Sequence, residues 1–148
     1  MIGTIIAIVL IGLGVALVLG LLYFLVRRRP RRKALNQQHF IERWKDLQRS
    51  LGNKASWREA LMTADGLLDE ALKKKRVRGK GMGERLVKVQ RSLSDNDGAW
   101  FGHKLRNKIE QEPDTKLKEK DVKQALVGIR QALKDLGALP DGHHRNKK

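Results

Sequence analysis

An uncharged, mainly aliphatic run of 25 residues extends from Ile2 to Val26, and all 32 Lys and Arg and all 16 Asp and Glu residues lie at or beyond Arg27. As a helix rising about 1.5 Å per residue, this run would reach roughly 37 Å, which exceeds the roughly 30 Å hydrocarbon core of a bilayer. A cleaved signal peptide is the alternative, but such a peptide has a basic segment before a shorter apolar stretch. No cation precedes this run, so we expect a retained transmembrane anchor over residues 1–26.

Six cations lie within the seven residues that follow the run. Because cationic flanks stay on the cytoplasmic side, we expect a single-pass protein of the inner cell membrane with its N-terminus outside and all later residues in the cytoplasm. We also expect this basic juxtamembrane linker, residues 27–35, to contact anionic lipid head groups of the bilayer. The residues predicted to make that contact are Arg27, Arg28, Arg29, Arg31, Arg32 and Lys33.

Apolar residues recur at helical spacing through the rest of the chain. Phe40, Trp44 and Leu47 begin one such stripe, and no segment alternates with the period of a strand. The sequence therefore predicts an all-α fold, in which a transmembrane helix precedes a small antiparallel bundle of about five helices over residues 36–139. Residues 140–148 are expected to form a basic disordered tail.

Three details of this bundle follow from single residues. Ser56 and Glu59 have the spacing of a capping box, which predicts the start of a helix. Phe101, Leu105 and Ile109 are expected to form the apolar arc of a later helix. All three tryptophans, Trp44, Trp57 and Trp100, are expected to be largely buried.

Most catalytic and metal-binding chemistries are excluded by composition or spacing. The chain has no Cys, which excludes disulfides, thiolate zinc sites and cysteine nucleophiles. The glycines of 79–83 match neither phosphate-loop pattern, and 95–98 fails as a calcium loop because Lys104 takes the position of its closing Glu. The carboxylates of Asp65, Asp69 and Glu70 are expected to form ordinary ion pairs. We therefore predict no metal and no cofactor.

Two polar clusters remain. His103, Arg106 and Asn107 lie on neighbouring turns of a predicted helix, and they predict either a polar groove in the bundle or a hydrogen-bonded network that fixes helix packing. Between residues 73 and 91 there are nine cations and one acid, a balance typical of a phosphate-binding patch. Nucleic acid and anionic lipid both remain open as its ligand. The residues of this patch are Lys73, Lys74, Lys75, Arg76, Arg78 and Lys80.

Several segments carry a resemblance to known proteins. Residues 57–69, the Gly81-Met82-Gly83-Glu84-Arg85-Leu86 segment and the stretch from Trp100 to Ile109 resemble a group of small bacterial membrane proteins with one N-terminal span and a cytoplasmic helical domain. Arg106-Asn107 is also similar to the Arg-polar-x-x-x-His motif of HEPN domains, which are helical bundles and often ribonucleases. In that alignment Gln111 occupies the histidine position, and an amide cannot act as a general base near neutral pH.

Together these features predict a membrane-anchored helical interaction or scaffold module without catalytic activity, which binds a protein partner of unknown identity. A membrane-tethered nucleic-acid-binding protein is the first alternative. A degenerate HEPN-type ribonuclease, with His103 replacing the missing base, is the second.

Overall fold

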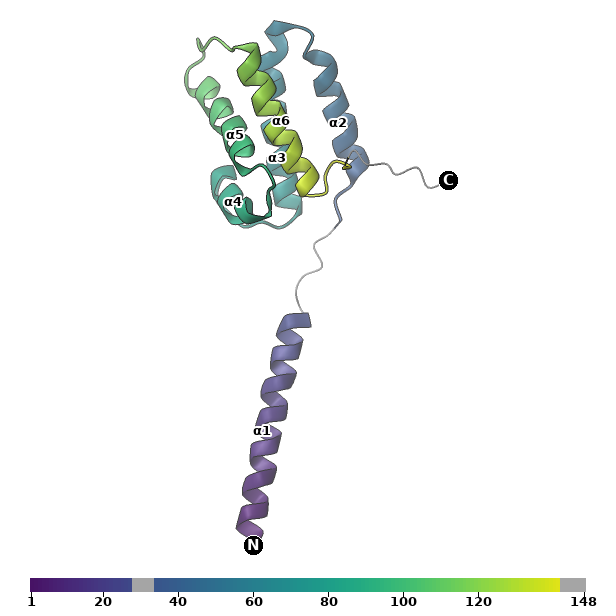
Figure 1. The fold of residues 1–148 in the computed structure, drawn as a ribbon, viewed down its shortest axis with the longest axis vertical. Coiled ribbons are helices and arrows are strands. Elements are labelled where there is room, and N and C mark those ends of the chain that lie inside the picture. Colours follow the sequence, from purple (N-terminus) through teal and green to yellow (C-terminus); the bar gives the residue numbers. More distant parts are fainter. Residues whose placement is uncertain (28–33, 142–148) are drawn as a thin grey trace, which may run out of the picture. The chain divides into compact units, whose positions relative to one another are not determined.

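The computed structural model describes residues 1–27 and 34–141, which fall into two compact units, Met1–Arg32 and Lys33–Lys148. Every secondary-structure element in the described ranges is helical, which confirms the predicted all-α class (Figure 1). The α-helices are α1 Ile2–Arg27, α2 Gln37–Ser50, α3 Trp57–Lys74, α4 Met82–Val89, α5 Asn96–Gln111 and α6 Glu119–Asp135. Short 3₁₀ turns at Lys54–Ser56 and Gln90–Ser92 precede α3 and follow α4.

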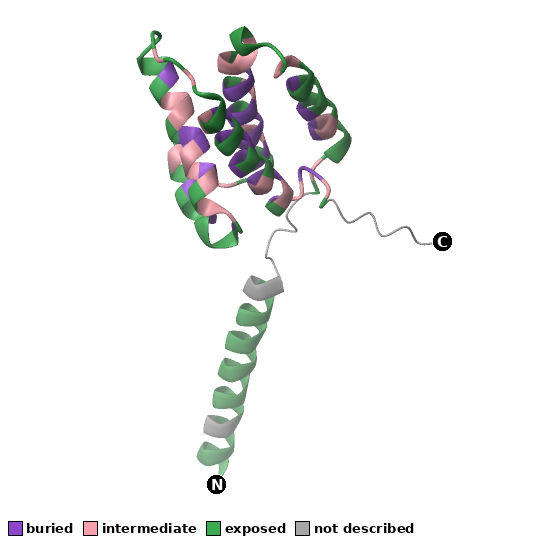
Figure 2. Ribbon diagram, turned by 45° about the horizontal axis from the view of Figure 1, so that its top comes forward, coloured by how far each residue is buried: buried purple, intermediate pink, exposed green. Residues whose placement is uncertain are grey.

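Helix α1 makes up the first unit. Its segment Ile2–Phe24 is long and apolar enough to cross a membrane. The described side chains of this segment are all exposed, and none of them belongs to a packed core (Figure 2). A helix that is apolar on every side is typical either of the core of a large protein or of a membrane span.

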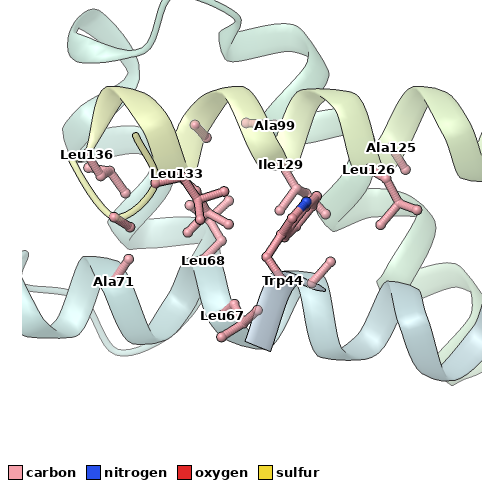
Figure 3. Close-up of a cluster of buried hydrophobic side chains, with 14 of the residues drawn as sticks. Trp44, Leu67, Leu68, Ala71, Ala99, Ala125, Leu126, Ile129, Leu133 and Leu136 are labelled. Carbon is pink, nitrogen blue, oxygen red and sulfur yellow. The ribbon is translucent and has the colours of Figure 1, made fainter. Parts of the chain in front are cut away.

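The second unit holds the hydrophobic core, to which α2 to α6 all contribute. Helices α3 and α6 supply fully buried residues such as Leu68 and Leu133, and α2 adds Phe40 and Trp44. Figure 3 shows the Trp44 ring pointing toward Ile129 and Leu126 of α6. Because the core residues all lie between Leu35 and Leu139, the bundle needs nothing from α1 to bury its apolar surface.

The prediction of three buried tryptophans is right only for Trp44, which is 5% exposed. Trp57 and Trp100 are half-buried and pack against the edge of the core. The Trp57 indole Nε1 donates a hydrogen bond to the Leu51 carbonyl oxygen at 3.0 Å, which holds the ring at the boundary between α2 and α3. An amphipathic ring of this kind keeps its polar edge near the surface.

Helices α5 and α6 approach each other through glycines. A Cβ atom on Gly102 would lie 2.7 Å from Ile129 Cδ1, and one on Gly128 would lie 2.5 Å from the Gly98 Cα. This close contact buries the side of α5 that carries Ala99, Gly102 and His103.

The contact between α5 and α6 also corrects the predicted apolar arc of α5. Of its three members, Ile109 is buried, whereas Phe101 and Leu105 are only half-buried. Periodicity alone counts large apolar residues, and it therefore overlooks a face that packs through glycine.

The predicted helix start at Ser56 is confirmed, since α3 begins at Trp57, but the capping box itself does not form. Ser56 is the N-cap residue, but its side chain makes no capping hydrogen bond. Its backbone is already helical (φ −87°, ψ −5°) because it closes the preceding 3₁₀ turn. Asn53 instead caps that turn, accepting a hydrogen bond from the Ala55 N–H at 3.0 Å.

Candidate functional site: a polar pocket between α3, α4 and α5

The three residues of the predicted polar groove, His103, Arg106 and Asn107, line one pocket of about 400 Å³. One wall is the side of α3 that carries Asp65 and Asp69, and the start of α4 contributes another part of the lining. The remaining lining residues are Met62, Gly66, Gly81, Met82 and Gly83. Among the described residues, those that line the pocket carry no hydroxyl, thiol or lysine nucleophile.

A hydrogen-bonded pair forms the floor of the pocket. The His103 Nδ1 atom lies 3.0 Å from Asp65 Oδ1 and 3.2 Å from Asp65 Oδ2, and both residues are buried. The pair joins α5 to α3 across 38 positions of sequence. A buried carboxylate and a buried imidazole each need such a partner, so the pair stabilises the packing of the two helices.

Asn107 determines which nitrogen of His103 carries the proton. The Asn107 Oδ1 atom accepts a hydrogen bond from Arg106 Nη1 at 3.0 Å, and this assigns the amide Nδ2 to the His103 Nε2 atom, 3.2 Å away. Since Nδ2 can only donate, Nε2 of the neutral ring accepts, and Nδ1–H donates to Asp65. Both ring nitrogens are thus engaged by side chains of the chain itself.

The Arg106 guanidinium is engaged in the same way. Its Nε atom lies 3.7 Å from Asp65 Oδ2, and its two terminal nitrogens bind the Glu110 carboxylate. Two carboxylates and the Asn107 amide therefore surround the guanidinium. The arrangement places a cation in the lining of the pocket and engages three of its five N–H donors in hydrogen bonds to Asn107 and Glu110.

A second ion-pair cluster lies where α3 faces the start of α4. Asp69 binds Arg85 Nη2 at 2.7 Å and Lys73 Nζ at 2.7 Å, and Arg85 Nη1 donates to the Gly79 carbonyl oxygen at 2.5 Å. Burial by itself raises the pKa of Asp69, but hydrogen bonds from Lys73 and Arg85 and the charges of both outweigh it. The pKa of Asp69 therefore lies below its usual 3.8. The predicted ion pairing of this carboxylate is confirmed.

The six residues of the predicted phosphate patch differ in their contacts. Lys73 and Lys74 pair with Asp69 and Glu70 on α3, at 2.7 and 3.5 Å. In the part of the chain that the structure describes, the other four make no ion pair, and three of them are exposed while Lys75 is half-exposed. The four residues are Lys75, Arg76, Arg78 and Lys80.

Five of the six residues of the predicted lipid contact lie outside the residues that the structure describes. Arg27 ends helix α1, while Arg28, Arg29, Arg31, Arg32 and Lys33 lie outside the described residues, as does most of the predicted tail.

Sequence reasoning also missed Asp65 as a member of the pocket. Its position on the apolar stripe of α3, between Ala64 and Leu67, was the available signal, because a carboxylate there must be buried with a partner.

Gln111, the residue that takes the place of the HEPN histidine, is exposed at the end of α5 and is not among the residues that line the pocket. Arg106 and Gln111 therefore do not converge on one site within this chain.

No family model matches the sequence, and comparisons with curated proteins and with solved structures find no match.

Proposed function

We propose that the protein is a membrane-anchored helical interaction module without catalytic activity. The observation that carries the proposal is the closed network of the pocket, in which Asp65 and Asn107 engage the two His103 nitrogens. A general base must reach the proton that it removes with a nitrogen lone pair, and here the Nε2 lone pair accepts from Asn107. The network instead fixes α5 against α3, as expected of a module whose task is to present a rigid surface.

The apolar helix α1 supports the anchoring part of this proposal, because its segment Ile2–Phe24 is long enough to cross a bilayer. The six cations of residues 27–33 support an orientation with the bundle in the cytoplasm, since such flanks resist translocation. The protein then belongs to the inner cell membrane, with a protein partner still to be identified.

A reporter fused after Lys148 tests the orientation. We expect activity from a reporter that works only in the cytoplasm and none from one that works only in the periplasm. Exchanging the six cations of 27–33 for glutamine, together with three lysines added before Ile2, should weaken or reverse this bias. Periplasmic activity of the unmodified chain would overturn the assignment.

Ribonuclease activity tests the claim that the protein is not an enzyme. We expect the purified full-length protein in detergent to leave RNA intact without metal, because His103 has no free nitrogen and Gln111 cannot transfer a proton. Cleavage that disappears in both His103→Ala and Arg106→Ala would contradict this expectation. Gln111→His is the complementary probe, and activity gained there would support the HEPN-like alignment while showing that only the base is absent.

Nucleic-acid binding at the membrane is the second candidate function, and one contact favours it. Lys104 Nζ lies 6.0 Å from the centre of the half-buried Trp100 ring. A Cβ on Gly83 would lie 3.7 Å from that ring, so the ring sits beside the start of α4. An aromatic face next to cations is the arrangement on which single-stranded bases stack.

A further inference from the structure

The net charge of the bundle is concentrated in one segment. Between residues 73 and 91 there are nine cations and one acid, whereas the rest of 34–141 has fourteen cations and fifteen acids. Outside this segment the bundle is therefore nearly neutral. A charge excess confined to so short a stretch gives the domain one strongly positive surface, and it leaves the other surfaces without a long-range preference for anions.

Within this segment, structure separates cations that hold the fold together from cations that face solvent. Arg85 is 7% exposed and binds Asp69, so it belongs to the core of the domain. Between the end of α3 and the start of α4, the chain presents four cations that pair with no acid in the described residues, Lys75, Arg76, Arg78 and Lys80. We call residues 75–80 the basic loop.

Arg76 occupies a backbone conformation that disfavours arginine. Its φ is +58°, two residues after the end of α3, and the following Val77 N–H donates to the Leu72 carbonyl oxygen at 3.0 Å. Helix α6 ends in the same way, with Gly137 at φ +74° and the Ala138 N–H bonded to the Leu133 carbonyl oxygen. Glycine is the residue that such a helix end favours. Arg76 thus carries a conformational cost that Gly137 avoids, and a cost of this kind points to a functional role for its side chain.

The basic loop lies at the end of the bundle where the chain arrives from α1. His39, in the first turn of α2, binds Glu70 at 3.1 Å, and Glu70 also binds Lys74, which directly precedes the loop. Figure 1 shows the connection from α3 to α4 at the same end of the bundle as the start of α2. Only residues 28–36 separate α1 from α2, so no conformation places the end of α1 more than about 36 Å from the start of α2. An anchor in a membrane therefore keeps this end of the bundle close to the lipid surface.

We propose that the basic loop is a docking surface for the anionic lipid head groups of the membrane that holds α1. The proposal rests on the proposed membrane anchoring. Charge complementarity with acidic phospholipids and the position of the loop at the tethered end favour lipid over RNA, because the head groups are always within reach. Docking orients the bundle with the opposite end, where α5 connects to α6, toward the cytoplasm.

Full-length protein in lipid nanodiscs tests the proposal. The chain has no Cys, so Gln90→Cys, directly after α4, and Gln111→Cys, at the end of α5 where the chain turns toward α6, each provide a single fluorophore site. Both glutamines are exposed. The discs would consist of phosphatidylcholine with about 30% phosphatidylglycerol, because anionic lipid produces the negative surface potential that attracts cations. A nitroxide on the lipid head groups would serve as the quencher. We expect stronger quenching at position 90 than at 111, and loss of that difference in pure phosphatidylcholine or at high salt.

Two charge variants make the comparison specific. Exchanging Lys75, Arg76, Arg78 and Lys80 for glutamine should lower the ratio of docked to undocked bundles several-hundred-fold at low salt, since each cation contributes about five-fold. The matched control exchanges four exposed cations toward the other end for glutamine, and it should leave docking unchanged. These four are Lys108, Lys116, Lys118 and Lys120.

Two substitutions of Arg76 distinguish its effect on docking from its effect on fold stability. Arg76→Gly should raise the melting temperature of the bundle by about 2–5 °C and weaken docking about five-fold, whereas Arg76→Gln should weaken docking equally without the gain in stability. If Arg76 had only a structural role, Arg76→Gly would not raise the melting temperature while it weakened docking.

Three results would overturn the proposal. The first is equal quenching at positions 90 and 111, and the second is quenching unaffected by the loop variant. The third is release of the loop from anionic discs by single-stranded RNA at low micromolar concentration, which would assign the loop to nucleic acid. Failure of the anchoring itself is distinguishable, because the protein would then not enter the discs at all.

Discussion

Gly128→Ala is expected to destabilise the bundle by about 3 kcal/mol, the upper range for added atoms in a packed core. A Cβ at this position would lie 2.5 Å from the Gly98 Cα and closer still to its carbonyl group. Because the obstacle is backbone rather than a flexible side chain, α5 and α6 must separate to admit the methyl group. That movement would also disturb the packing of Ile129 against Gly102.

Urea unfolding followed by tryptophan fluorescence measures this loss. The tryptophans lie at positions 44, 57 and 100, so the signal reports the bundle and not α1. Gly66→Ala is the matched control, since a Cβ at Gly66 meets nothing within 4 Å on the surface of α3. That change should stabilise the bundle by about 0.5–1 kcal/mol, because alanine favours a helix interior. Similar effects of both substitutions would show that α5 and α6 do not meet through glycine.

The two glycines also show what periodicity can and cannot predict. Each helix of the bundle was predictable because its apolar residues recur every three or four positions, which is a local property of sequence. Whether a glycine such as Gly66 or Gly128 faces solvent or another backbone depends on which helices become neighbours. Pairing of helices is settled by the whole core, so the sequence alone could not show that α5 is buried along Ala99, Gly102 and His103 as well as at Ile109.

The polar pocket shows the same division between local and long-range information. The spacing of His103, Arg106 and Asn107 placed them together, because residues three and four apart share a helix face. Their partner Asp65 lies on another helix, and only the packing of α3 against α5 brings its carboxylate to His103. The basic segment likewise could be recognised from composition, whereas the burial of Arg85 within it could not.

Arg85→Met is expected to cost about 3–5 kcal/mol, as is typical when one partner of a buried ion pair is removed. The Arg85 side chain is 8% exposed, and its guanidinium binds Asp69 Oδ1 at 2.7 Å and the Gly79 carbonyl oxygen at 2.5 Å. Methionine fills a similar volume but provides no donor. The Asp69 carboxylate would then keep Lys73 but lose Arg85, and the Gly79 carbonyl oxygen would lose its donor, in a region from which water is largely excluded.

Lys73→Met provides the control, since Lys73 binds the same carboxylate but its side chain is 60% exposed. Removing an exposed partner of an ion pair should cost less than about 1 kcal/mol. If both variants lost the same stability, the burial of Arg85 would not be what makes its ion pair important.

The dependence of this loss on pH identifies the ion pair as its source. The pKa of Asp69 lies below its usual 3.8 because the hydrogen bonds and charges of Lys73 and Arg85 outweigh its burial. A carboxyl with a lowered pKa in the folded state contributes stability above its usual pKa and loses that contribution as the pH falls through the lowered value. The difference in unfolding free energy between wild type and Arg85→Met should therefore be constant above about pH 5 and shrink below the usual pKa of an aspartate. Urea unfolding at pH 7, 5 and 3.5 measures this difference, and a difference that stays constant through pH 3.5 would assign the loss to packing instead of charge.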